Sequence, residues 1–184
     1  MKKVLIVVDV QNDFVNGSLG SEQAQSIILY VRDKLNEYVH RGDKIIFTRD
    51  THPVNYLETQ EGKNLPVEHC ITGTDGWNIY GGLDKGCTGC VYIDKPSFGW
   101  PKWDETLNPI INEIDEIEIC GLCTDVCVVS NALIIKAHFP EIKVTVDAQC
   151  CAGITEESHK AALLTMSMCQ VNVIKNDNSE EDMK

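Results

Sequence analysis

The chain passes from an apolar strand into a helix within one short stretch, Ile119-Cys120-Gly121-Leu122-Cys123-Thr124-Asp125-Val126-Cys127-Val128-Val129. The pattern predicts that the strand ends near Cys120 and that the helix begins near Thr124. Cys127 would then lie in the first helical turn, where the partial positive charge of the helix N-terminus favours a thiolate. The stretch therefore predicts a nucleophilic cysteine beside the carboxyl end of a strand.

Apolar runs along the rest of the chain repeat the alternation of strand and helix. Strands are predicted at 4–8, 44–48, 91–93, 117–120, 143–146 and 171–174. Helices are predicted at 22–40, around 107–114, at 124–138 and at 155–169. This order predicts the α/β class, a doubly wound, mainly parallel six-stranded sheet with helices on both faces. Residues 50–88 lack strong periodicity, and so long a connection usually carries function.

Length and charge narrow the class of protein further. The 184 residues favour one domain over residues 1–175, followed by an acidic tail at 176–184. A net charge of -12 argues against a nucleic-acid partner. No apolar run approaches the roughly 20 residues of a membrane span. Because the N-terminal segment reads as a strand and not as a signal peptide, we expect a cytoplasmic protein with reduced thiols.

Polar side chains follow the predicted strands at the edge where a doubly wound sheet binds ligands. Asp9 follows the first strand, Lys95 the third and Cys127 the fourth, while Asp147 follows the fifth. Three of these residues have a structural alternative. Asp9 could be a capping carboxylate, Lys95 a solvated lysine and Cys127 a buried core thiol. The turn after Asp9 has no glycine cluster, which argues against a dinucleotide site.

A second group of side chains has the chemistry of metal ligands. Asp50 and His52 alternate along an extended segment and therefore project to the same side, and His69 follows in the long connection. Such a set can hold a divalent metal with open positions, although loop histidines are more often solvent-exposed. A further carboxylate ligand could come from Glu61, with two neighbouring alternatives, Glu58 and Glu68.

Two cysteine pairs have the C-x-x-C spacing of zinc or redox sites, Cys87 with Cys90 and Cys120 with Cys123. The first pair directly precedes a predicted strand and the second ends one. A thioredoxin-like pair would instead open a helix after an early strand. The sequence therefore favours reduced thiols without a metal or redox role, and adjacent Cys150 and Cys151 read as core residues.

Several of these stretches together resemble the isochorismatase-like cysteine hydrolases, and within them the nicotinamidase branch. The resemblance covers about residues 4–174. The matching stretches are 8–14 (VDVQNDF), 48–52 (TRDTH), 69–76 (HCITGTDG), 94–99 (DKPSFG) and 121–128 (GLCTDVCV). It implies a catalytic triad of Asp9, Lys95 and Cys127. The implied metal ligands are Asp50, His52 and His69, with Glu61 as the extra ligand of some bacterial members.

The resemblance also implies how a substrate would be held. Backbone N–H groups of Cys123 and Cys127 would form the oxyanion hole, with a non-proline cis peptide before Cys123. Many relatives have alanine in place of Cys123, but only its backbone is needed. Phe14 would stack on a substrate ring, and the aromatic pocket wall would come from the segment after Lys95, with Phe98 and Trp100 as alternatives.

The implied activity is conversion of nicotinamide to nicotinic acid and ammonia through a thioester on Cys127. One divalent ion would orient the pyridine ring; zinc suits the ligand set, and iron or manganese would also fit. A homo-oligomer is expected because the family commonly associates. The main alternative is another amide or ureido hydrolase of the superfamily, and those enzymes generally lack the metal ligands. An isochorismate hydrolase would typically lack the cysteine, and a non-catalytic thiol or metal-binding protein would not need the triad.

Overall fold

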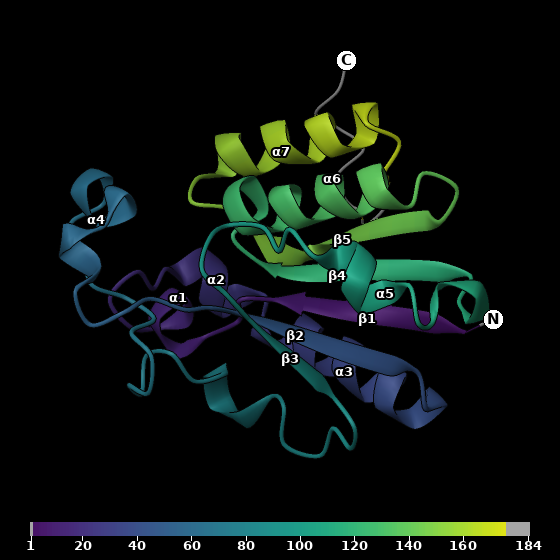
Figure 1. Ribbon diagram of the computed structural model, residues 1–184, viewed down its shortest axis with the longest axis horizontal. Coiled ribbons are helices and arrows are strands. Elements are labelled where there is room, and N and C mark those ends of the chain that lie inside the picture. Colours follow the sequence, from purple (N-terminus) through teal and green to yellow (C-terminus); the bar gives the residue numbers. More distant parts are fainter. Residues whose placement is uncertain (1, 176–184) are drawn as a thin grey trace.

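The computed structural model describes residues 2–175, and the predicted acidic tail at 176–184 lies outside the described residues. Six parallel strands form one sheet in the order β3-β2-β1-β4-β5-β6 (Figure 1). This arrangement confirms the predicted fold class. The strands are β1 (Lys3–Val8), β2 (Lys44–Asp50), β3 (Val91–Lys95), β4 (Glu116–Leu122), β5 (Lys143–Ala152) and β6 (Asn172–Ile174).

Helices cover both faces of this sheet, as a parallel sheet requires. On one face α3 packs on β2 and β5, and on the other α6 packs against α5, α7 and β5 (Figure 1). The helices are α1 (Asn12–Val15), α2 (Glu22–Ser26), α3 (Ile28–Arg41), α4 (Gln60–Asn64), α5 (Trp103–Leu107), α6 (Val129–His138) and α7 (Glu156–Met168). Three 3₁₀ turns and one π turn complete the elements: η1 (Tyr56–Glu58), η2 (Tyr80–Gly82), η3 (Ile111–Glu113) and η4 (Thr124–Val128).

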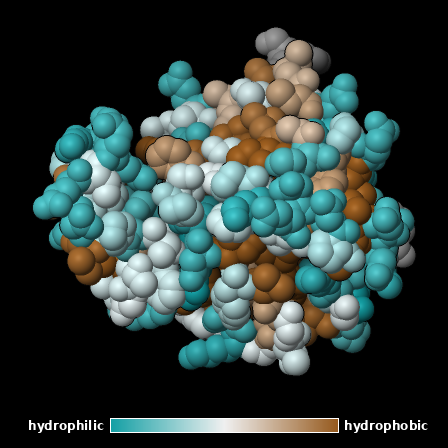
Figure 2. All heavy atoms as spheres, viewed as in Figure 1, coloured by the Kyte–Doolittle hydropathy of each residue, from teal (hydrophilic) through white to brown (hydrophobic). Residues whose placement is uncertain are grey.

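The core lies between the central strands and the two helical layers. Every residue of β1 from Val4 to Val8 is fully buried, as expected for a strand covered on both faces. Among the described residues, no helix is both long enough and apolar enough to cross a membrane. The lobe that carries α4 is covered mainly by hydrophilic residues (Figure 2).

Four strands continue beyond the ends predicted from their apolar runs, and one of them is β4, which ends at Leu122 and not near Cys120. β2 continues to Asp50 and β3 to Lys95, so both polar residues are the last residues of strands. β5 continues to Ala152 although Asp147 interrupts its apolar pattern. The register passes from the pair Ile119–Val146 to Gly121–Cys151, so residues 147–150 lie opposite Cys120 alone. Asp147 therefore lies within β5, 2.8 Å from Lys34 Nζ, and the prediction that it follows the strand is wrong.

Two of the predicted helices need correction, and the helix predicted at 124–138 begins as the π turn η4 before it continues as α6. The predicted helix at 22–40 is two helices, α2 and α3, which are separated at Ile27. The one predicted around 107–114 is the short α5 followed by η3. The segment 50–88 contains η1, α4 and η2; α4 contacts η1, whereas η2 contacts α1 near the start of the chain.

Gly121 allows β4 to approach the end of β1. Its φ of 122° lies in a region that favours glycine, and a Cβ there would lie 2.1 Å from the carbonyl oxygen of Val8. A side chain at position 121 would therefore collide with the backbone of Val8, which cannot move aside as a flexible side chain could. This close approach brings the residue after β1 and the turn after β4 to the same edge of the sheet.

Candidate active site

Asp9 lies directly after β1 and is fully buried. Its φ of 49° is left-handed, a conformation that costs free energy in a non-glycine residue and that clusters at functional sites. Thr48 Oγ1 donates to Asp9 Oδ1 at 2.6 Å, and Asp9 Oδ2 lies 2.6 Å from Lys95 Nζ. Burial raises the pKa of Asp9 despite the opposing charge of Lys95. The carboxylate is thus a stronger base than an exposed aspartate.

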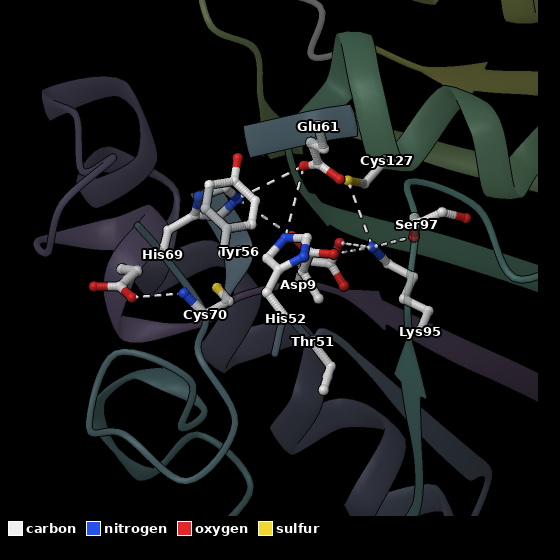
Figure 3. Close-up of polar contacts among 12 residues, drawn as sticks. Asp9, Thr51, His52, Tyr56, Glu61, His69, Cys70, Lys95, Ser97 and Cys127 are labelled. Atoms are coloured by element: carbon white, nitrogen blue, oxygen red, sulfur yellow. Dashed lines mark hydrogen bonds and ion pairs between the residues drawn. The ribbon is translucent and has the colours of Figure 1, made fainter. Parts of the chain in front are cut away.

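Lys95 is the cation on which the other groups converge. Its Nζ lies 3.4 Å from Asp50 Oδ1, donates to Ser97 O at 3.0 Å and reaches Cys127 Sγ at 3.6 Å (Figure 3). Burial by itself would lower the pKa of Lys95, but the acidic groups of Asp9, Cys127 and Asp50 outweigh burial and raise it. Lys95 therefore stays protonated in the core.

Cys127 lies in the π turn η4, and its side chain faces Lys95 and Asp9. The residue is only 4% exposed. Burial and the charge of Asp9 raise the pKa of its thiol well above the usual value, and Lys95 opposes this only partly. The helix N-terminus favours the thiolate, and burial of the sulfur opposes it. A neighbouring base has to take the proton before the sulfur can attack.

Asp50, His52, Glu61 and His69 bring one ligand atom each within 4.8 Å of one another. Asp50 ends β2, His52 follows it, Glu61 comes from α4 and His69 from the connection after α4. His52 Nε2 lies 2.8 Å from Asp50 Oδ2 and 3.6 Å from Glu61 Oε1. His69 Nε2 lies 3.5 Å from Asp50 Oδ2 and 3.9 Å from Glu61 Oε1. Figure 3 shows the carboxylate of Glu61 directed toward the imidazoles of His52 and His69.

The charges of this group fit a divalent cation. Burial alone would raise the pKa of Asp50, but the hydrogen bonds of His52 and His69 and the charge of Lys95 hold it far below its usual value. Burial and the charge of Asp50 raise the pKa of Glu61. Two carboxylates that repel one another and two imidazole nitrogens are a donor set for a metal ion, which would neutralise the repulsion.

Neighbouring groups orient the two imidazoles. His69 Nδ1 lies 2.8 Å from Val67 O, so Nδ1 donates to this carbonyl and Nε2 is turned toward Asp50 and Glu61. Tyr56 is fully buried beside both rings, with its ring centroid 4.7 Å from that of His52 and 5.0 Å from that of His69. Its hydroxyl donates to Leu65 O at 2.9 Å. No signal in the sequence distinguishes Tyr56 from other loop aromatics.

Gln11 was also missed by the sequence analysis. It is fully buried, its Oε1 accepts from Asp50 N at 2.7 Å, and its Nε2 donates to Asp50 O and Trp77 O at 2.9 Å. The side chain thus holds the backbone of Asp50 on both sides. The signal was its place in the stretch after the first strand, two residues beyond Asp9.

Asn131 on α6 joins the cysteine turn to the segment after β3. It is fully buried, and its Nδ2 donates to Cys127 O at 2.8 Å and to Phe98 O at 3.1 Å. Its Oδ1 accepts from Trp100 N at 2.9 Å and from Trp103 Nε1 at 2.8 Å. Every hydrogen-bonding position of the amide is used. Asn131 has no sequence signature, because its partners come from three separate segments.

The residues expected to contact a substrate lie around these groups. Phe14 on α1 packs edge-on against His69, with ring centroids 5.6 Å apart. Phe98 is 46% exposed, whereas Trp100 is half-buried and donates through Nε1 to Thr106. The peptide between Leu122 and Cys123 is cis, as the resemblance implied, and Cys123 directly precedes η4. The structure thus brings the triad and the four metal-ligand candidates together and places the aromatic residues nearby.

Comparisons with known proteins identify the family of this chain. Residues 3–178 match the Isochorismatase domain family. The chain is 29% identical over 189 residues to the nicotinamidase/pyrazinamidase of Mycobacterium tuberculosis, across 94% of this chain and 98% of that protein. It is similar to the nicotinamidase/pyrazinamidase PncA of Bacillus subtilis, with a TM-score of 0.82, 27% identity and coverage of 95% of this chain and 100% of that one. The pyrazinamidase of Pyrococcus horikoshii in complex with zinc has a TM-score of 0.80, 26% identity and coverage of 95% and 99%. The chain therefore belongs to the isochorismatase family.

Proposed function

We propose that this chain is a metal-dependent cysteine amidohydrolase that converts nicotinamide to nicotinic acid and ammonia. The observation that carries the proposal is the contact between the two groups of side chains. Asp50 Oδ1 lies 3.4 Å from Lys95 Nζ, while Asp50 Oδ2 lies 2.8 Å from His52 Nε2. Asp50 thereby connects the proposed nucleophile, Cys127, and the proposed metal site for the pyridine nitrogen within one buried centre. The similarity to nicotinamidases supports the choice of substrate.

The first half of the reaction uses Asp9 as a base and then as an acid. Asp9 takes the proton of Cys127 as the sulfur attacks the amide carbonyl carbon. The carbonyl oxygen becomes an oxyanion that the backbone N–H groups of Cys123 and Cys127 stabilise. Asp9 returns the proton to the amide nitrogen, the C–N bond breaks, and ammonia leaves a thioester on Cys127.

The second half reverses these roles. Asp9 takes a proton from water as the water oxygen attacks the thioester carbon. Collapse of the second tetrahedral species breaks the C–S bond, and the sulfur recovers the proton from Asp9. Lys95 keeps its charge throughout and balances whichever of Asp9 and Cys127 is ionised. The products are nicotinic acid and the resting thiol.

Asp50, His52, His69 and Glu61 would hold one divalent ion, and the bound ion would supply a Lewis acid for the pyridine nitrogen. Zinc is the metal we propose, because the set mixes imidazole nitrogens and carboxylate oxygens and because the similar Pyrococcus horikoshii protein is in complex with zinc. Phe14 beside His69 would stack on the ring, and Phe98 or Trp100 would close the opposite side.

The test measures ammonia release from nicotinamide together with metal content in the same sample of purified protein. We expect turnover by the wild type with about one zinc per chain, background activity in Cys127→Ala, and loss of metal in His52→Ala. Cys169→Ala is the matched control, because Cys169 is exposed. An enzyme that is fully active without stoichiometric metal would redirect the proposal to metal-free amidases of the superfamily. Metal binding without ammonia release would indicate a non-catalytic protein.

A further inference from the structure

The loop before β3 contains two cysteines that the proposed reaction does not use. Cys87 and Cys90 are free thiols, and both are partly exposed. Gly86 with a φ of 98° and Gly89 with a φ of 79° turn the backbone around them in conformations that favour glycine. The loop thereby presents both cysteines at the amino end of the strand whose other end is Lys95.

Both cysteines line one cavity of about 310 Å³. The opposite wall of this cavity comes from the end of α3 and the start of β2, including Asp43 and Lys44. A volume of this size admits a small molecule beside both residues. The pair is therefore reachable by a low-molecular-weight reagent without any opening of the core.

The other described cysteines do not offer such a pair. In the second C-x-x-C pair only one cysteine is accessible, because Cys120 is fully buried and Cys123 is partly exposed. Cys169 is exposed, but its neighbours in sequence include no second cysteine. The remaining described thiols are buried: Cys70, Cys127, Cys150 and Cys151.

A structural zinc site does not fit Cys87 and Cys90. Structural zinc takes four protein ligands. Within residues 2–175, three or more metal-ligand side chains converge only at Asp50, His52, Glu61 and His69. Two cysteines with no further ligand can instead interconvert between a dithiol and a disulfide.

The surroundings of Cys90 disfavour its thiolate. Burial and the neighbouring Cys87 raise the pKa of Cys90 to about 12. Cys90 therefore remains a thiol near neutral pH and is a poor first nucleophile, since the thiolate is the attacking species. The exchange would accordingly begin at Cys87 and finish at Cys90.

We propose that Cys87 and Cys90 form a reversible disulfide by exchange with a low-molecular-weight disulfide. The sulfur of Cys87 attacks the reagent, forms a mixed disulfide and releases one small thiol. The sulfur of Cys90 then loses its proton and attacks the Cys87 sulfur, which releases the second small thiol. The protein pair is oxidised by two electrons and the small disulfide is reduced to two thiols, so atoms and electrons balance.

This redox site lies away from the proposed nucleophile. Cys90 directly precedes β3 and Lys95 is its last residue, a separation of about 16 Å at the rise of an extended strand. Cys127 is buried on the far side of Lys95. Oxidation of the loop should consequently leave the catalytic cysteine as a thiol.

The experiment incubates the reduced, full-length, native protein with oxidised glutathione, quenches with acid and measures intact mass and peptide maps. We expect a species lighter by two hydrogen atoms, with the link between Cys87 and Cys90, and full reversal by dithiothreitol. Cys90→Ser should stop at a stable glutathione adduct on Cys87. Cys87→Ser should react at least about tenfold more slowly at Cys90, because that thiol is protonated.

Cys169→Ser is the matched control, since it removes an exposed thiol elsewhere and should leave the internal disulfide unchanged. Accumulation of a glutathione adduct on the wild-type pair without closure would overturn the proposal. So would stoichiometric zinc on the pair, or modification of Cys127 in place of the pair. Ammonia release, measured before and after oxidation, should change less than about twofold if Cys127 is untouched.

Discussion

The proton on Cys127 decides the chemistry at the scale of single residues. Burial and Asp9 hold the thiol protonated, and the carboxylate of Asp9 is the adjacent group that can accept its proton. Lys95 Nζ lies 2.6 Å from Asp9 Oδ2, and its positive charge offsets the negative charge that Asp9 or Cys127 carries in the core. The reactivity of Cys127 thus depends on its neighbours and not on its own pKa.

Asp9→Asn should lower turnover of nicotinamide by about 10² to 10⁴-fold, the usual contribution of a general acid–base group. The amide keeps the shape of the side chain but cannot accept the thiol proton. Steady-state ammonia release with metal analysis measures the effect, and metal content should stay at the wild-type value. Asp33→Asn is the control, since Asp33 is exposed on α3. Near-normal turnover of Asp9→Asn would assign the base to another group.

Asn131→Ala tests whether that amide positions the nucleophile. It removes the hydrogen bonds to Cys127 O, Phe98 O, Trp100 N and Trp103 Nε1, and each buried group left unsatisfied costs about 1–3 kcal/mol. We expect a lower melting temperature, and slower alkylation of Cys127 in the protein that remains folded. Asn108→Ala, at an exposed position, should change neither. A loss of stability with unchanged alkylation would make Asn131 purely structural.

At the scale of elements, charged side chains join neighbouring strands under α3. Glu116 begins β4, is 2% exposed, and lies 2.8 Å from Lys3 Nζ and 3.0 Å from Lys143 Nζ. Thr145 Oγ1 also donates to Glu116. Burial would raise the pKa of Glu116, but these partners outweigh burial and lower it from 4.5 to about 2. The carboxylate therefore stabilises the packing of β1, β4 and β5 while it is ionised.

The free energy of unfolding should consequently fall with acid. A lowered pKa contributes stability that is complete above the unfolded value of 4.5 and is lost as pH falls toward about 2. The contribution is on the order of 3 kcal/mol for this shift. Denaturant unfolding of wild type and Glu116→Gln should differ most near neutral pH and converge in acid. Glu113 is exposed, so Glu113→Gln should show the same pH dependence of unfolding as the wild type. A difference between wild type and Glu116→Gln that does not change with pH would contradict the prediction.

At the scale of the whole molecule, the metal-ligand group joins the long connection to the sheet. Asp50 belongs to β2, whereas Glu61 and His69 come from the lobe around α4 that projects beside the sheet (Figure 1). A bound ion would hold these two parts together through four side chains. Its binding free energy would therefore stabilise the folded lobe as well as the site.

Adding zinc to metal-free protein should raise the melting temperature and protect residues 53–79 from proteolysis. The expected stabilisation is about 2.7 kcal/mol when free zinc exceeds its dissociation constant a hundredfold. Glu61→Gln should weaken zinc affinity at least about tenfold, as loss of a ligand does. Glu58→Gln should leave it unchanged, because Glu58 accepts from Asn55 outside the group. Equal effects of the two substitutions would exclude Glu61 as a ligand.

The sequence by itself determined the α/β class, the parallel strands and the edge where polar residues gather. Continuous apolar runs such as 4–8 bury both faces of a strand, and parallel strands place their carboxyl ends along one edge. The positions of Asp9, Lys95 and Cys127 on that edge followed from these rules. The convergence of Asp50, His52 and His69 could be predicted only in part, because the long connection that carries His69 lacks the hydrophobic periodicity that would predict its fold.

Only the tertiary structure decided the environment of these side chains. The length of β5 past Asp147, the packing of Tyr56 against His69 and the hydrogen bonds from Asn131 to Phe98 and Trp100 depend on partners distant in the chain. The protonation of Cys127 was also decided by the tertiary structure, because the desolvation of its thiol depends on all the groups that surround it. Local patterns encode which face of an element is apolar. Contacts between segments arise only when those faces pack, and they determine which groups titrate, bind metal or react.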